Sequence, residues 1–340
     1  MLTDGYKSLS RDVNKVKGDA PTEGVVSEFL PELELSMEDD ELIKLKDTWI
    51  KAWEPYSKEI EKKQQDNEDY WLGKHFTAGD SKRPLVDNLI FESLETFLPI
   101  ATRPKADPLV ESDNTEQGNV IAQKVRQMLV YISDILSYNL KLKQVARYWA
   151  LYLLGAMKVG WSMKENDITC LAVRPQKLIL DPKATIEECE YKGYYIGEYL
   201  EDMASDLVVR FPKESKYIKD KVKDKMGTNV SYIMWTTDDY FFWTLDNEVL
   251  AKAKNPHWNY ETEQTAPMNE FGSITTDPTG QPQMVTVEGK NHFKNKKKPY
   301  VFLSVFNLGK QPHDDTNLVQ QNLPLQDLIN KRLTQIDKNA

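Results

Sequence analysis

The chain has 340 residues, of which 29% are charged, and its formal net charge is −9 at pH 7. A chain of this length can bury a sizeable core, in one large domain or in about two to three small ones. The acidic balance argues against a general nucleic-acid binder, which normally carries a basic excess. An ordinary acidic cytosolic protein is the favoured interpretation of this charge. The charge does not exclude a wall along which DNA slides, which would be better neutral or acidic because each Lys or Arg contact to a phosphate adds affinity.

Cysteine usage and hydropathy predict a soluble protein in a reducing compartment. Cys170 and Cys189 have neither a CxxC spacing nor partnering histidines, and reduced thiols are the simplest account of such a pair. The N-terminus shows no signal peptide, and no apolar run approaches the ~20 residues that a membrane span needs.

The N-terminal third begins with an arm and continues as helix. Residues 1–35 are polar and without a sustained period, which predicts an extended N-terminal arm. A capping box at Ser36–Asp39 predicts the start of the first helix, and Pro55 is placed to kink it before it continues to Gly73. Its apolar residues recur at three- and four-residue steps, as in an amphipathic helix. They are Leu42, Leu45, Trp49, Ile50 and Trp53.

Further apolar stripes make residues 36–160 mostly helical. One helix is predicted from Pro84 to Pro99, because proline suits a first helical turn. A proline-marked loop follows it. Another is predicted over 121–136, and Tyr138–Asn139 interrupts the pattern before it resumes. The stripes are Leu85, Leu89, Ile90, Leu94, Phe97 and Leu98; Ile121, Val125, Met128, Leu129, Ile132 and Leu136; and Leu142, Val145, Trp149, Tyr152 and Leu153.

The stretch from Tyr148 to Phe211 turns this helical part onto a small sheet. Gly155 and Gly160 mark the change from helix to strand, where the chain is expected to need conformations open mainly to glycine. Asp181–Pro182 ends a strand, since Pro cannot donate to a ladder. Segment 161–229 is therefore predicted to be mixed α/β. Its predicted elements are strands at 168–173, 177–180 and 194–199 and a helix at 200–211.

Segment 230–310 is predicted to be β-rich. Leu245–Asn247 has the character of a hairpin turn, and residues 261–290, rich in Thr, Pro, Gly and Gln, predict a mobile loop. The predicted strands are 230–236, 240–245, 248–251 and 299–306. The whole chain is thus predicted to be α+β.

Segment 311–340 ends in a predicted helix over 318–338, with Pro324 placed at a helix start. Its apolar stripe needs a surface to bury it. Either the helix packs back on the first helices, or further chain or another subunit covers the stripe, and we expect the second. The stripe consists of Leu325, Leu328, Ile329, Leu333 and Ile336.

Catalytic motifs are missing from the sequence. Gly73–His75 and Gly309–Gln311 lack the glycine spacing and the hydroxyl of a phosphate-binding loop, and GxSxG, HExxH and GxGxxG do not occur. Asp238–Asp239 and His313–Asp315 are the metal-binding candidates. A turn between strands is the favoured interpretation of the first, and a solvated loop leading to a helix cap at Asp315 or Thr316 that of the second. No cofactor or metal is therefore expected.

Two groups of residues are candidates for contact with DNA. The aromatic segment Tyr240–Trp243 suggests base stacking, although packing in a core or subunit interface is favoured because these aromatics lie in a strand. The basic run before residue 299 is the best candidate for facing phosphates, and a solvated loop is its alternative. The run consists of Lys290, Lys294, Lys296, Lys297 and Lys298.

Over residues 36–340 the sequence resembles the portal, or head-to-tail connector, proteins of tailed bacteriophages, in particular the type common in short-tailed phages. The shared order of several short segments carries the resemblance. These segments are Tyr70–Gly73; Asn88–Pro99 followed by Thr102-Arg103-Pro104; Leu154–Trp161; Val173-Arg174-Pro175 with Leu180-Asp181-Pro182; Asn255-Pro256; and Leu318–Asn330 with Lys331.

The resemblance implies a structural protein of the virion rather than an enzyme. Such proteins form a ring, usually of twelve subunits, at one vertex of the capsid, assembled in the host cytoplasm. Double-stranded DNA passes through the channel during packaging and ejection, and the major capsid protein, the terminase and tail adaptors bind the ring. No membrane is involved.

The resemblance also assigns regions of the portal fold. Residues 36–229 correspond to wing, 230–306 to wing or clip, and 318–338 to a helix approaching the stem or channel. Portal chains are usually longer than 340 residues, so the chain is expected to continue beyond the last helix.

Two alternatives remain open. One is a metal-dependent DNA-processing enzyme that uses Asp238–Asp239 or His313–Asp315. The other is a head–tail adaptor or scaffold protein that binds protein partners without forming a channel.

Overall fold

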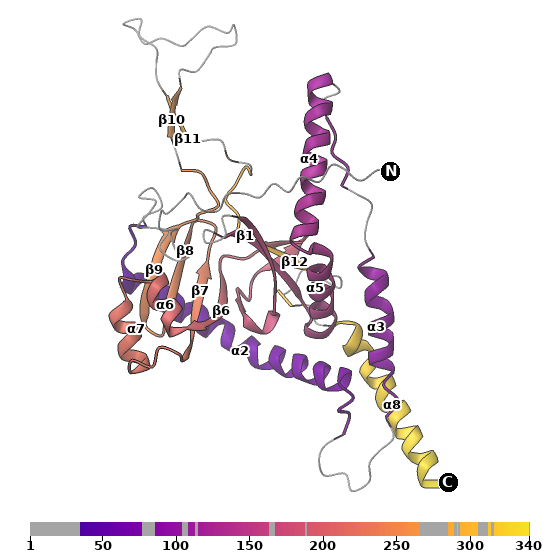
Figure 1. Ribbon diagram of the computed structural model, residues 1–340. Coiled ribbons are helices and arrows are strands. Elements are labelled where there is room, and N and C mark those ends of the chain that lie inside the picture. Colours follow the sequence, from indigo (N-terminus) through magenta and orange to yellow (C-terminus); the bar gives the residue numbers. More distant parts are fainter. Residues whose placement is uncertain are drawn as a thin grey trace, which may run out of the picture.

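The computed structural model describes residues 35–76, 86–103, 108–112, 115–162, 167–187, 189–260, 262–265, 285–288, 291, 293–304, 312–313 and 316–339. Helices and antiparallel sheets build an α+β fold, as predicted (Figure 1). The helices are α2 (Asp39–Trp71), α3 (Leu89–Ala101), α4 (Glu116–Ile135), α5 (Tyr138–Tyr152), α6 (Ala204–Arg210), α7 (Ser215–Val222) and α8 (Leu318–Asn339), with a 3-10 turn η2 (Pro175–Lys177).

Two sheets carry most of the strands. One has the strand order β12-β1-β2 and the other β3-β6-β7-β8-β9, while β4-β5 and β10-β11 are two-stranded ribbons. The strands are β1 (Gly155–Ser162), β2 (Asp167–Val173), β3 (Leu178–Leu180), β4 (Thr185–Glu187), β5 (Glu190–Lys192), β6 (Ile196–Met203), β7 (Asn229–Thr236), β8 (Tyr240–Leu245), β9 (Glu248–Lys254), β10 (Thr262–Thr265), β11 (Val285–Glu288) and β12 (Tyr300–Leu303).

The five-stranded sheet crosses the sequence position at which the β-rich segment was predicted to begin. Strands β6 and β7 pair antiparallel over their full length, from Ile196 opposite Thr236 to Met203 opposite Asn229. Segments 161–229 and 230–310 therefore share one sheet. The same ladder corrects the helix predicted from residue 200, because β6 holds residues 200–203 as strand and α6 begins only at Ala204. The predicted turn at Leu245–Asn247 does connect β8 and β9.

Helix α2 is one 33-residue helix that continues through Pro55. Its N-cap is Glu38, whose side chain makes no capping hydrogen bond, so the capping box predicted at Ser36 is wrong. Three acidic residues in the first turn instead face the positive end of the helix dipole. The first half of α2 packs on the five-stranded sheet, where Trp49 stacks on Tyr195 at a centroid distance of 4.5 Å.

The junction of α5 and β1 depends on one close approach. A Cβ atom at Gly155 would lie 2.6 Å from the carbonyl oxygen of Val145, so only glycine lets the strand pass this close to the helix. The left-handed conformation at this junction belongs to Leu153, with φ of 71°, and not to either predicted glycine. Strand β1 then pairs with β12, which brings Gly155 opposite Leu303.

A buried ion pair connects the two sheets. Lys158 Nζ on β1 donates to Glu198 Oε2 on β6 at 2.8 Å, and the Tyr300 hydroxyl on β12 donates to the same oxygen at 2.6 Å. Both partners of this carboxylate come from the three-stranded sheet, so its charge is hydrogen-bonded although it is buried. Most of segment 261–290 lies outside the described residues, but its two ends form the β10–β11 ribbon.

Candidate functional site

The lysine run before β12 is engaged in ion pairs within the chain. Lys296 Nζ lies 3.1 Å from Asp239 Oδ1, and Lys298 Nζ lies 2.9 Å from Asp238 Oδ1. Lys297 Nζ lies 2.8 Å from a carboxylate oxygen of β5. The first two pairs connect the run to the turn between β7 and β8, and the third connects it to β5. Lys294 is exposed, and Lys290 lies outside the described residues.

The same pairs define the surroundings of the acidic candidates for metal binding. Asp238 and Asp239 each face a lysine ammonium. No three His, Cys, Asp or Glu side chains converge anywhere in the described ranges. Asp314 and Asp315 fall outside those ranges, while His313 is buried with its ring 5.8 Å from that of Trp53.

Aromatic residues of β8 pack inside the protein. Tyr240, Phe241 and Phe242 are buried and Trp243 is half-buried. The packing interpretation of this segment is therefore confirmed, because buried rings offer no free face to a nucleic-acid base.

Helix α8 starts at a different residue from the one predicted, and it buries a different face. Its first turn is capped by Asn317, whose side-chain oxygen accepts from the Gln320 amide at 2.8 Å, so a cap at Asp315 or Thr316 is wrong. Pro324 lies inside the helix and not at its start. The buried face of α8 is partly polar. Gln326 is 1% exposed and Asn330 is 3% exposed, whereas Leu325, Leu328 and Ile336 of the predicted stripe are exposed.

Gln326 is buried because it caps another helix. Its Oε1 accepts from the backbone amides of Leu89 at 3.0 Å and Ile90 at 3.4 Å, at the start of α3. Its Nε2 donates to the Asp87 carbonyl oxygen at 2.6 Å and to Asn330 Oδ1 at 3.0 Å. The first amides of a helix lack partners within the helix, so this glutamine satisfies groups that α3 leaves open.

A second group of bonds joins α8 to the end of α2. Asn330 Nδ2 donates to His75 Nδ1 at 2.9 Å, and His75 Nε2 donates to the Tyr70 carbonyl oxygen at 2.8 Å. The Tyr70 hydroxyl donates to Asp327 Oδ1 at 2.6 Å. Together with Gln326, these bonds orient α8 on α2 and α3, and the helix then extends away from the body (Figure 1). Part of α8 thus packs back on the first helices while much of its apolar stripe stays uncovered.

Helix α4 presents an even larger uncovered apolar face. It extends from the body on a different side from α8 (Figure 1), and no residue along it is buried. Monomeric soluble proteins rarely expose contiguous apolar patches larger than a few hundred Å². We call the apolar residues of this helix the α4 face. They are Val120, Ile121, Val125, Met128, Leu129, Tyr131 and Ile135.

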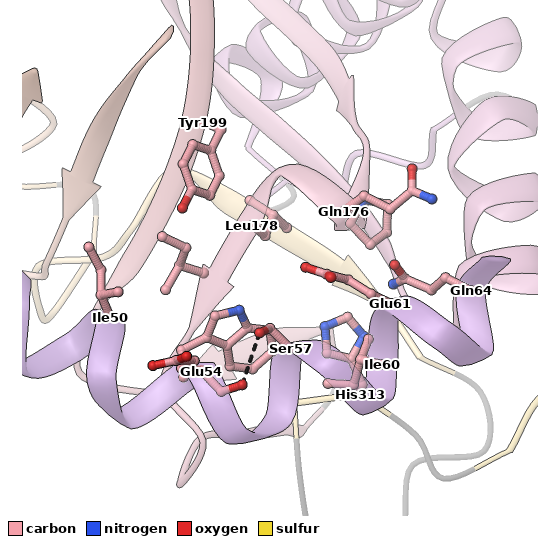
Figure 2. A pocket seen from close by; sticks show the side chains of 13 residues that line it. Ile50, Glu54, Ser57, Ile60, Glu61, Gln64, Gln176, Leu178, Tyr199 and His313 are labelled. Atoms are coloured by element: carbon pink, nitrogen blue, oxygen red, sulfur yellow. Dashed lines mark hydrogen bonds between the residues drawn. The ribbon is translucent and has the colours of Figure 1, made fainter. Parts of the chain in front are cut away.

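A pocket opens beside the middle of α2, against η2, β3 and β6 (Figure 2). Its volume is about 210 Å³. Its apolar wall includes Ile50, Trp53, Ile60, Pro175, Leu178 and Ile179. Its polar wall consists of Glu54, Ser57, Glu61, Gln64, Gln176, Tyr199 and His313.

Two buried polar side chains of this pocket have atoms without a hydrogen-bond partner. Gln64 is 1% exposed and donates through Nε2 to the Tyr152 carbonyl oxygen at 3.1 Å, but its Oε1 accepts no hydrogen bond from the described residues. His313 is 3% exposed, and neither of its ring nitrogens has a partner within the described ranges. Buried polar atoms are nearly always hydrogen-bonded, so these atoms make the pocket a candidate binding site for polar groups.

Burial lowers the pKa of His313 from 6.5 to about 4. The folded protein therefore binds fewer protons than the unfolded chain between these two pH values, and its stability falls as the pH is lowered through this window. We expect a loss of up to about 3 kcal/mol from this one group. Urea unfolding of the wild type and of His313→Gln at pH 7 and pH 4.5 measures it.

The variant is expected to lose less stability than the wild type over this pH range. His257, whose pKa burial and Lys158 also lower, is present in both proteins and cancels in the comparison. Equal pH dependence in the two proteins would show that His313 is not the titrating group.

The sequence predicted the apolar stripe of α8 and the lysine run, but neither the polar face of α8 nor the pocket was predicted. Spacing alone offered one signal, because Gln326 and Asn330 lie four residues apart and so share one helix face, as do Gln64 and Asn67 at three residues.

Among the described residues, no helix is long and apolar enough to cross a membrane. Comparison with known proteins adds no relative: no family model matches the chain, and no curated protein matches it significantly.

Proposed function

We propose that this chain is a subunit of a bacteriophage portal ring, which serves as the conduit for the genome during packaging and ejection and as the binding platform for the terminase and tail adaptors. The observation that carries the proposal is the pair of helices α4 and α8, which extend from the body with apolar residues uncovered. A closed ring is built from heterologous interfaces, so each subunit must present two different complementary surfaces. Two separate amphipathic helices suit this requirement.

Charge supports the same proposal. The net charge is −9, and three lysines of the basic run are paired with carboxylates of the same chain. A channel that lets DNA slide must avoid many strong phosphate contacts, because each one adds affinity. In this proposal the protein performs no bond chemistry and acts through geometry and electrostatics in the virion.

The uncovered helices also suit a head–tail adaptor or scaffold protein, which is the second candidate. The two differ in assembly, because an adaptor of this kind forms no ring with an open channel.

The test is the assembly state of the protein expressed from its complete gene. Light scattering and negative-stain electron microscopy are expected to show rings with a central hole wide enough for duplex DNA. The double variant Ile121→Asp, Met128→Asp on the α4 face is expected to abolish the rings, because it places charges in an apolar interface. The matched control Gln123→Asp, Gln127→Asp adds the same charge on the side of α4 turned away from Ile121 and Met128 and is expected to leave the rings intact.

Two results would contradict the proposal: a monomer at every concentration, and an assembly without an open channel. Rings that survive both double variants equally would exclude the α4 face from the subunit interface.

A further inference from the structure

The pocket beside α2 is acidic and holds acceptor atoms that the described residues leave without a partner. Gln64 Oε1 is buried there without a partner. Neutral His313 offers one ring nitrogen as an acceptor and the other as an N–H donor, and neither has a partner among the described residues. The Glu61 carboxylate lines the same pocket (Figure 2). Burial raises the pKa of the neighbouring Tyr199 phenol, and the Glu61 carboxylate raises it further. Three acceptors thus line a single hollow.

The charge and the wall of the pocket further restrict the chemical class of ligand that can bind. Its charged side chains, Glu54 and Glu61, are both acidic, and Glu54 is also paired with the exposed Lys58 at 3.3 Å. Trp53 contributes an indole ring to the apolar wall. A ligand that fits must therefore be cationic, must offer several donors, and must have a surface that can lie on an aromatic ring.

We propose that this pocket binds the guanidinium group of an arginine side chain presented by a partner polypeptide. A guanidinium offers five N–H donors in a planar fork, which suits several separate acceptors. Its flat face stacks on aromatic rings, and it is more weakly hydrated than an ammonium. A lysine ammonium has three donors and loses more hydration on entering a partly apolar pocket.

The size of the pocket identifies the source of the guanidinium. Pockets that enclose complete drug-sized ligands measure about 300–1,000 Å³, whereas this one measures about 210 Å³. A single side chain fills such a space, with the rest of its polypeptide lying outside along α2. The proposal does not depend on ring formation, because it rests on acceptors within one chain.

The experiment titrates the full chain with Nα-acetyl-arginine methylamide at pH 7, with the imidazole signals of His313 followed by NMR. The chain has four histidines, and the His313→Gln variant assigns the signal. The blocked citrulline analogue, which keeps the shape and lacks the charge, and the blocked lysine analogue serve as comparison ligands. We expect the arginine probe to shift the His313 signals and to bind about tenfold or more tightly than the citrulline probe.

Two exposed glutamates of α2 give a matched pair of variants. Glu61→Gln is expected to weaken binding of the arginine probe about tenfold, because it removes a charge-assisted hydrogen bond. Glu59→Gln removes the same charge outside the pocket, where Glu59 pairs with Lys63 at 2.9 Å, and is expected to leave binding unchanged. Both positions are exposed, so neither change is expected to unfold the protein.

Several results would overturn the proposal. Unchanged His313 signals at the solubility limit of the arginine probe would mean that the pocket holds only water. Equal binding of the arginine and citrulline probes, or equal effects of the two glutamate variants, would exclude recognition of the guanidinium charge. Tighter binding of free L-arginine than of the blocked form would replace the polypeptide with a small-molecule ligand.

Discussion

Replacement of Trp235 by alanine is expected to lower the free energy of unfolding by about 4 kcal/mol, because truncation of a buried tryptophan loses apolar burial and leaves a cavity. Trp235 is fully buried in the core between α2 and the five-stranded sheet. Its ring lies 5.3 Å from that of Trp49 and 6.2 Å from that of Phe242, centroid to centroid. Its Nε1 donates to Thr244 Oγ1 at 3.1 Å, so the variant also removes the partner of a buried hydroxyl.

The surrounding backbone is shaped to this side chain. A Cβ atom at Gly197 would lie 2.7 Å from the Trp235 ring, so β6 passes directly against it. Relaxation of the strand is therefore expected to fill the cavity only in part, which places the loss in the upper range for such substitutions.

Urea unfolding followed by far-UV circular dichroism measures this effect. Tyr131→Ala, an aromatic truncation on the exposed α4 face, is the control and is expected to change stability by less than about 0.5 kcal/mol in the monomer. A loss below about 1 kcal/mol for Trp235→Ala would contradict the position of this ring at the centre of the core.

Replacement of Gln326 by methionine is expected to cost roughly 3 kcal/mol and to release α8 from the body. Methionine has a similar size and shape but can neither accept from the amides of Leu89 and Ile90 nor donate to the Asp87 carbonyl oxygen. Two of the groups that lose Gln326, the Ile90 amide and the Asn330 side-chain oxygen, are buried, and each buried group left without a partner costs about 1–3 kcal/mol. The start of α3 and the contact between α3 and α8 are therefore expected to loosen together.

Hydrogen exchange distinguishes this local release from general destabilisation. In Gln326→Met, the amides of Leu89 and Ile90 are expected to exchange faster, while those of the β6–β7 ladder keep their protection. Gln321→Met changes an exposed glutamine of the same helix and is expected to behave as the wild type. Unchanged exchange at the start of α3 would show that Gln326 does not hold α8 there.

The uncovered stripe of α8 and the polar network have one common cause. A helix can turn only one side inward, and the side chosen here carries Gln326 and Asn330, which satisfy backbone and side-chain groups of α2 and α3. Leu325, Leu328 and Ile336 of the stripe stay exposed. A helix that packed through its apolar residues alone would have buried the stripe instead.

Local periodicity by itself determined several elements of this protein. The three- and four-residue spacing of apolar side chains predicted α2, α4, α5 and α8, and the turn residues at Leu245–Asn247 predicted the β8–β9 hairpin, because these features depend on neighbours in the sequence. The break predicted at Tyr138–Asn139 lies slightly earlier in the structure, at Leu136 and Ser137 between α4 and α5, and Tyr138 already begins α5. The presence and type of long elements were therefore predictable, while their ends, such as the start of α6, depended on strand pairing.

Only the tertiary structure decided which surfaces meet and which functional groups come together. The pairing of β1 with β12 joins Gly155 to Leu303 across a long stretch of chain, and the ion pairs of the lysine run depend on the β7–β8 turn lying beside it. Local sequence carries no signal for such contacts. The same holds for the pocket: Gln64 and His313 lie far apart in sequence, and only folding places both side chains in the wall of one pocket beside α2.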